Sequence, residues 1–132
     1  MNFFSLSLFL TSATALGINC RGSGFCTINN GASLQVVHDQ VGNLVASGGG
    51  DRRFNSGDQI ACSHGSQGSF CAFYQNGASG SAKDAYNQIQ QLLDHGCRGC
   101  GSVPTQPGND VSKGELTVNY VSNACCEGDC HC

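Results

Sequence analysis

Apolar residues recur at helical spacing most clearly in the stretch SGSAKDAYNQIQQLLDHG, residues 79–96. Ser79 or Ser81 can cap the start of a helix there, and Gly96 stands where a helix commonly ends. One face of the predicted helix is apolar, and it comprises Ala82, Ala85, Tyr86, Ile89, Leu92 and Leu93.

A second helix is predicted for residues 32–41, where Leu34, Val37 and Val41 lie three and four positions apart. Two adjacent β-branched valines in this segment leave a strand open as the alternative. The stretch that follows, residues 42–58, is dominated by Gly, Ser and Asn and is predicted to be a mobile loop.

Strand patterns occur in two other parts of the chain. Residues 59–63 and 69–75 are β-rich runs on either side of a Gly/Ser turn, which predicts a β-hairpin. Residues 115–121 alternate apolar with polar side chains, which predicts a half-buried strand. Because strands and two helices interleave without a regular βαβ repeat, the pattern favours an α+β layer structure over a doubly wound sheet.

The chain begins with a short apolar run, residues 3–10, followed by small residues that end in Ala13, Thr14 and Ala15. The run is far shorter than the roughly 20 residues that a membrane-spanning helix needs, and an Ala-x-Ala motif suits cleavage. We therefore predict a secretory signal peptide over residues 1–15. The rest of the sequence contains no segment apolar enough to span a membrane.

All ten cysteines follow this segment. An even number of cysteines in a short, Gly-rich secreted chain predicts five disulfide bonds. Each could contribute roughly 2–5 kcal/mol, which matters because a chain of this size buries a modest core. Cys97 and Cys100 form a Cys-x-x-Cys pair, whose spacing suits half of a zinc site, a redox dithiol or two separate disulfide anchors.

Charge narrows the choice of partner. The net charge of −3 gives no electrostatic case for nucleic acid or an anionic membrane surface. No cofactor is predicted, and we expect a monomer without lipid insertion.

Three blocks of the sequence resemble the killer-toxin family often called type four, whose prototype is a secreted toxin encoded by a virus of a smut fungus. They are LGINCRGSGFC (16–26), DHGCRGCGSVP (94–104) and GNDVSKGELTVNYVSNAC (108–125). The resemblance assigns residues 16–125 to a killer-toxin-like domain, with Cys125 at the family's final cysteine. Residues 126–132 then form an additional Cys-rich tail.

The resemblance implies an α/β sandwich, in which an antiparallel sheet of about five strands carries two helices on one face. It also implies that Cys20 pairs with Cys97 and that Cys26 pairs with Cys100. Sequence leaves the remaining bridges open. If Cys62 pairs with Cys71, the tail holds two local bridges; if Cys62 reaches Cys125 instead, Cys71 must pair with a tail cysteine.

The stretch CCEGDCHC offers a possible metal site, because its soft ligands lie within eight residues. They are Cys125, Cys126, Cys130, His131 and Cys132. Oxidation after secretion would consume the thiolates, so we predict disulfides and no metal.

Calcium-channel block in the prototype is attributed to a surface lysine just before the cysteine that matches Cys62. Here Ile60 stands two residues before that cysteine, and the chain is acidic where the prototype is basic. Arg52 and Arg53 form the only adjacent basic pair, on a Gly-rich segment, and we predict that they bind the target. Lys113, before the last strand, is a further binding candidate, with a solubilising turn residue as the alternative.

Catalysis would need a nucleophile or an acid–base pair. Residues that could in principle build one are His38, His64, His95, Asp39, Asp58 and Asp94, but none lies in a recognisable catalytic motif. We predict that the protein is not an enzyme.

The predicted function is inhibition of a rival or host cell by a secreted toxin-like protein or effector. Its partner would be a surface or membrane protein of the target cell, with a calcium channel as the candidate. The alternative is a non-toxic secreted binding or structural protein of the fungal surface.

Overall fold

Helix α2 (Ala82–Asp94) forms where the apolar periodicity predicted it. The Ser81 side chain caps the helix by accepting from the Asp84 backbone N–H at 3.0 Å, so Ser81 rather than Ser79 is the cap. The chain leaves the helix through Gly96, whose φ of 99° favours glycine. The buried positions are Ala82, Ala85, Ile89 and Leu92.

The computed structural model describes residues 16–27 and 29–132. The predicted signal peptide, residues 1–15, lies outside the described residues, and so does its predicted cleavage site.

Helix α1 (Leu34–Leu44) confirms the helical alternative for residues 32–41 but extends further. A wider turn, η2 (Val45–Gly49), continues it until Gly48 adopts a φ of 98°. The prediction of a loop from residue 42 was therefore wrong for its first part. Burial of Leu44 outweighs the weak helix propensity there. Gly42 also lets α1 approach α2, because a Cβ there would lie 2.9 Å from the Tyr86 ring.

Five antiparallel strands form the main sheet, in the order β5-β6-β3-β2-β7. They are β2 (Gln59–Gly65), β3 (Gly68–Gln75), β5 (Gly101–Pro104), β6 (Glu115–Val121) and β7 (Cys130–His131). The hairpin of β2 and β3 and the strand β6 confirm the sequence predictions. A second, two-stranded sheet joins β1 (Arg53–Phe54) to β4 (Gly80–Ser81).

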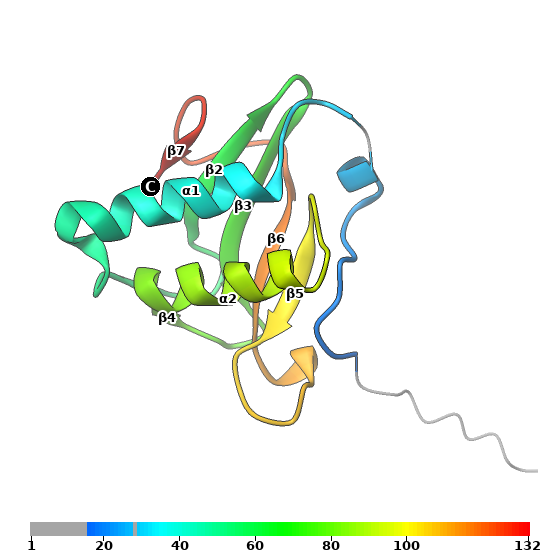
Figure 1. Ribbon diagram of the computed structural model, residues 1–132, viewed down its shortest axis with the longest axis vertical. Helices are drawn as coiled ribbons and strands as arrows, with labels where there is room; N and C mark the ends of the chain where they lie inside the picture. The colour runs from blue at the N-terminus through cyan, green and yellow to red at the C-terminus, as the bar shows by residue number, and fades with distance from the viewer. Residues whose placement is uncertain (1–15, 28) are drawn as a thin grey trace, which may run out of the picture.

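Both helices lie against the same face of the sheet (Figure 1). The core between these layers contains Leu34, Val37 and Val41 from α1 and Ile89 and Leu92 from α2. The inner face of the sheet contributes Phe70, Ala72, Tyr74, Val103, Leu116 and Val118. This is the predicted α+β sandwich, with the helices on one side only.

The two ends of the described chain lie against opposite edges of the sheet. Asn19 pairs with Ser102 of the edge strand β5 through two backbone hydrogen bonds. Near the other edge, the Gln59 side chain donates to the Asn123 carbonyl and accepts from the Cys125 N–H. Thr117 is only 3% exposed and its hydroxyl lies 3.0 Å from that of Ser102, so β6 begins more deeply buried than the alternating pattern predicted.

All ten cysteines form bridges. Cys20 is bonded to Cys97 and Cys26 to Cys100, the pairs that the resemblance implies. Cys97 and Cys100 are therefore separate anchors that tie the end of α2 to the amino-terminal segment. The other bridges are Cys62–Cys71, Cys125–Cys132 and Cys126–Cys130, which is the alternative with two local bridges in the tail.

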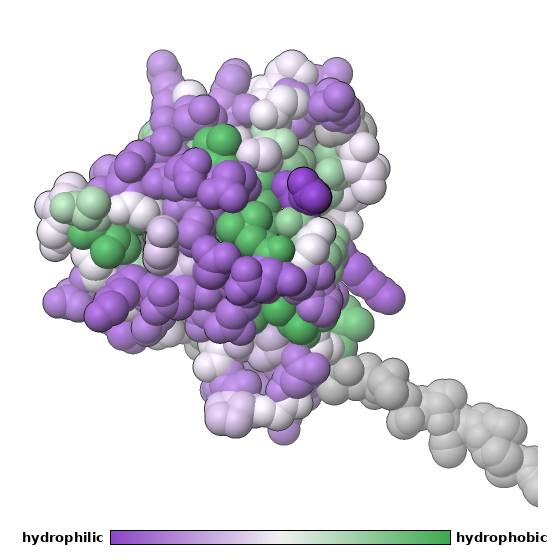
Figure 2. All heavy atoms as spheres, in the orientation of Figure 1, coloured by the Kyte–Doolittle hydropathy of each residue, from purple (hydrophilic) through white to green (hydrophobic). Residues whose placement is uncertain are grey.

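No helix in the described ranges has the length and apolarity to cross a bilayer. In the view of Figure 2, hydrophilic side chains dominate the face that carries the helices. Apolar side chains gather there in the middle, between α1 and α2.

His38 on α1 is 5% exposed and stacks on the Tyr86 ring with centroids 4.0 Å apart. Its buried Nε2 has no hydrogen-bond partner among the described residues. Burial lowers the pKa of His38 below the ordinary 6.5, although Asp39 and Asp94 oppose this shift. The folded protein therefore holds the imidazole neutral at a pH where the unfolded chain protonates it.

This shift predicts a loss of stability in mild acid. The contribution of His38 is complete above pH 6.5, and it is lost as the pH falls through that value toward the lower folded pKa. Urea unfolding at pH 7.5 and 5.0 measures the loss. His38→Phe keeps the stacking on Tyr86 and removes the titration, so we expect a smaller pH difference in this variant. An identical pH difference in both proteins would contradict the assignment to His38.

Candidate functional site

The basic loop, residues 50–54, connects η2 to the small sheet and carries the predicted binding pair. Its backbone is fixed at both ends. The first N–H groups of a helix have no partner within the helix, and here those of Ala82 and Lys83 bond to the carbonyls of Arg52 (3.0 Å) and Gly50 (2.9 Å). The predicted mobile loop is therefore replaced by a segment fastened to the start of α2.

Arg52 is exposed and held by two contacts. Its Nη2 donates to the backbone oxygen of Cys132 at 3.0 Å. Its guanidinium carbon lies 4.9 Å from the centroid of the Phe54 ring, which suits a cation–π interaction. Neither contact is with an Asp or Glu side chain, and the Arg52 side chain remains exposed to a partner.

Arg53 lies in β1 opposite Ser81 and is exposed. Successive residues of a strand point to opposite faces, and its neighbour Phe54 is buried at 4% exposure. Arg53 therefore points away from the core and contributes a second exposed guanidinium to the basic loop.

Lys83 is a third cation at this loop, and sequence reasoning missed it. It is exposed on the first turn of α2, and a Cβ placed on Gly50 would lie 3.7 Å from its own Cβ. Thirty residues of chain separate Lys83 from Arg53, and the pairing of β1 with β4 together with the bonds from the start of α2 to the loop brings them together. Neither strand, each two residues long, leaves a periodic signal in the sequence.

Lys113 is exposed in the short helix η3 (Val111–Lys113), which packs beside β5. The Asn76 side chain donates to the carbonyl of Val111, at the near end of the connection that leads to β4. The structure therefore places Lys113 in η3, outside the basic loop, and does not assemble it with Arg52 and Arg53.

Ile60, two residues before Cys62, is fully buried at 0% exposure and cannot meet a target. Its carbonyl accepts the Cys132 N–H at 2.8 Å, while the Cys132 oxygen accepts from Arg52. The Arg52 guanidinium is thus linked through a single residue to the backbone of Ile60. Arg52, which comes from a different segment, therefore places a cation at the edge of the sheet formed by β7.

The tail cysteines gather around the edge of β2. The Cys125 sulfur lies 3.9 Å from that of Cys62 and 3.3 Å from that of Cys126. With Cys132 these sulfurs form the one group of metal-ligand geometry found in the described ranges, all within 4.8 Å of one another. Each is oxidised in a bridge. Metal binding here would first require reduction to thiolates.

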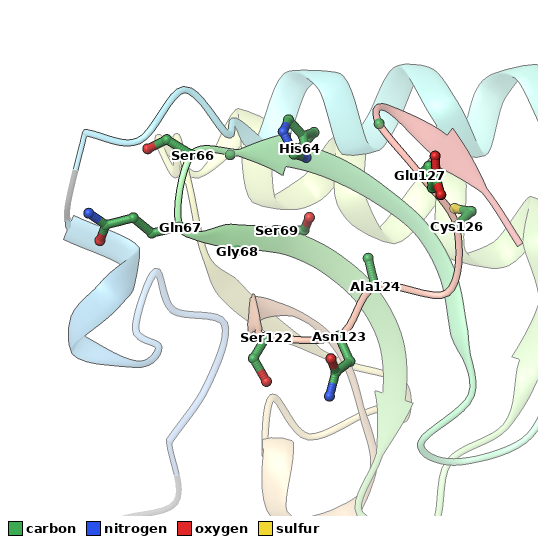
Figure 3. Close-up of a pocket in the computed structure, with 12 residues that line it drawn as sticks. His64, Ser66, Gln67, Gly68, Ser69, Ser122, Asn123, Ala124, Cys126 and Glu127 are labelled. Carbon is green, nitrogen blue, oxygen red and sulfur yellow. The ribbon is translucent and has the colours of Figure 1, made fainter.

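The histidines considered for catalysis lie on three different elements: His38 on α1, His64 on β2 and His95 at the end of α2. His38 is buried in the helix interface, and the structure does not bring the three together into one site. A polar groove of about 600 Å³ does lie beside His64, between the turn of the β2–β3 hairpin and the start of the tail (Figure 3). Its lining includes Gln67, Ser69, Asn123 and Glu127. A second hollow, of about 540 Å³, lies where the start of α1 meets the end of α2.

Comparison with known proteins gives the relationship. The Kp4 family model matches residues 3–122. The KP4 killer toxin of Ustilago maydis P4 virus is 39% identical over 127 residues, which cover 94% of each chain. This chain belongs to the Kp4 family. The Kp4 match ends before the cysteine-rich segment 125–132.

Proposed function

We propose that this Kp4-family chain is a secreted killer-toxin-like protein that inhibits a rival or host cell by binding a surface protein. Kinship with a killer toxin over 94% of both chains carries the proposal. The bridged fold supports it, because a chain stapled by five disulfides suits an extracellular environment.

Binding would occur through the basic loop. The accessible guanidinium groups of Arg52 and Arg53 can form charge-assisted hydrogen bonds with carboxylates, which commonly line the mouth of a cation channel. A calcium channel is the proposed target, with occlusion or modulation from outside as the mechanism. Neither catalysis nor lipid insertion is part of it.

Growth inhibition by the purified, oxidised protein tests this function on fungal and plant cells, with and without excess calcium. We expect inhibition that calcium relieves. The same protein, fully reduced and alkylated, is the control and should be inactive. Inhibition that calcium does not relieve would contradict the calcium-channel mechanism but not the toxin function.

A second function, a non-toxic binding or structural protein of the fungal surface, is favoured by two observations. Position 60 carries a buried isoleucine in place of an exposed cation, and the net charge of the chain is −3. Absence of inhibition in every cell type tried, at concentrations well above micromolar, would support this function and contradict the toxin proposal.

A further inference from the structure

The tail segment, residues 125–132, is attached to the rest of the protein without a covalent cross-link. Both of its bridges, Cys125–Cys132 and Cys126–Cys130, join residues within the segment. Its attachment includes the short pairing of β7 with β2, the Cys132 N–H bonded to Ile60, the Cys125 N–H bonded to the Gln59 side chain at 2.7 Å, and Asp129 accepting from the His64 N–H at 2.8 Å. Figure 1 shows β7 at the edge of the sheet.

These contacts depend on the local bridges. A ladder of two residues cannot hold the tail segment in place by itself, because each ordered residue costs roughly 1–2 kcal/mol of backbone entropy. The bridge between Cys125 and Cys132 closes a short ring and removes much of that freedom in advance. Opening the ring should release Cys132 first.

Cys132 is also the residue that holds Arg52, since its backbone oxygen accepts from the Arg52 Nη2. Arg52 stays exposed, so the contact orients the side chain without hiding it. An arginine side chain carries about 2 kcal/mol of rotamer entropy. A guanidinium already fixed by Cys132 and Phe54 loses less of it on binding.

The tail bridges are the two that contain no buried cysteine. Each of the three remaining bridges contains at least one cysteine that is 3% exposed or less, namely Cys97, Cys100 or the pair Cys62 and Cys71. In the tail, Cys125 is exposed and its three companions are half-buried. Cys20 is exposed as well, but attack on its sulfur would expel the buried Cys97 as a thiolate, which burial disfavours, so an external thiol should reduce the tail first.

We propose that the tail segment is a redox-sensitive clamp, which holds Arg52 ready for its target while its bridges are intact and releases it when a thiol reduces them. Each bridge accepts two electrons and two protons from two external thiols, giving two cysteine thiols and one external disulfide. The consequence for inhibition rests on the proposed function of the basic loop, whereas the clamp itself does not.

The order of reduction is tested on the oxidised protein with increasing glutathione, followed by alkylation and mass spectrometry. We expect label at Cys125, Cys126, Cys130 and Cys132 before any at the six other cysteines. Label at Cys97 or Cys100 at the same glutathione concentration as the tail would overturn the redox selectivity. Because Cys125 lies 3.9 Å from the Cys62 sulfur, the freed thiolate could attack that bridge, so a variant is needed as well.

Cys125→Ser with Cys132→Ser opens the ring without creating a thiol at either position. NMR relaxation of the arginine Nε–H groups then reports on side-chain order. We expect increased motion of Arg52 in this variant, while Arg21 and Arg98, outside the basic loop, serve as internal references. Unchanged Arg52 dynamics in a folded variant would show that the tail does not hold this side chain.

The functional arm is a double-mutant cycle on growth inhibition. We expect the tail variant to raise the half-inhibitory concentration about three- to tenfold through lost preorganisation. In an Arg52→Ala background, the same tail change should add nothing, because the clamp has no side chain to hold. Additive losses would contradict the clamp. If the wild-type protein inhibits no cell, the proposed function fails, and the relaxation and alkylation measurements still decide the clamp.

Discussion

Replacing Cys20, Cys26, Cys97 and Cys100 together by serine is expected to lower the free energy of unfolding by about 4 kcal/mol or more at 25 °C. The two parallel bridges span 77 and 74 residues, and both must be removed because either one alone keeps this large loop closed in the unfolded chain. They also fasten the end of α2 to the segment that pairs with β5. Urea unfolding of the variant and the wild type, followed by circular dichroism, measures the difference.

The matched control replaces Cys125, Cys126, Cys130 and Cys132 by serine, because the two bridges of the tail span only 7 and 4 residues. It also removes two bridges from the chain, yet we expect a loss of about half or less, because short loops restore little entropy. The tail also lies at the edge of the sheet, outside the main core. Equal losses in the two variants would show that loop length does not govern the contribution of these bridges.

Long elements with one apolar face could be predicted from the sequence. In α2, spacing, cap and terminating glycine all indicate the same helix, and the β2–β3 hairpin has β-rich runs on either side of a Gly/Ser turn. The extension of α1 could not be predicted in this way. Its Gly, Ser and Asn content indicates a loop, and only the packing of Leu44 and the fit of Gly42 against Tyr86 explain the helix.

The short strands had no signal at all. Strands β1, β4 and β7 contain two residues each, so no period can be recognised within them. Their partners are set by the docking of distant segments. The same reason explains why Cys132 and Lys83 were missed as neighbours of the basic loop, although Arg52 and Arg53 were recognised as an adjacent pair.

The position of the family lysine shows the limit of residue-by-residue transfer. Sequence indicated a missing charge at Ile60, and the structure places that side chain in the core. What the sequence could not indicate is the chain of backbone contacts from Ile60 through Cys132 to Arg52. A cation can thus reach one edge of a fold from a different segment.

Replacing Arg52 and Arg53 together by alanine is expected to raise the half-inhibitory concentration at least tenfold. Buried interfacial arginines commonly contribute 2 kcal/mol or more to binding, and about 1.4 kcal/mol corresponds to a factor of ten. Both side chains are exposed and outside the core, so the variant should fold normally. Dose–response curves on a sensitive cell measure the effect, and circular dichroism checks the fold.

A control for charge alone is the double alanine variant of Arg21 and Arg98. It removes the same number of positive charges, two, but from exposed positions outside the basic loop. If inhibition depends on guanidinium groups seated in a partner, this control should change potency less than threefold, because long-range attraction between exposed charges is screened by salt. Equal losses from both variants would assign the effect to net charge. Full potency without Arg52 and Arg53 would show that another surface, with Lys113 the next candidate, contacts the target.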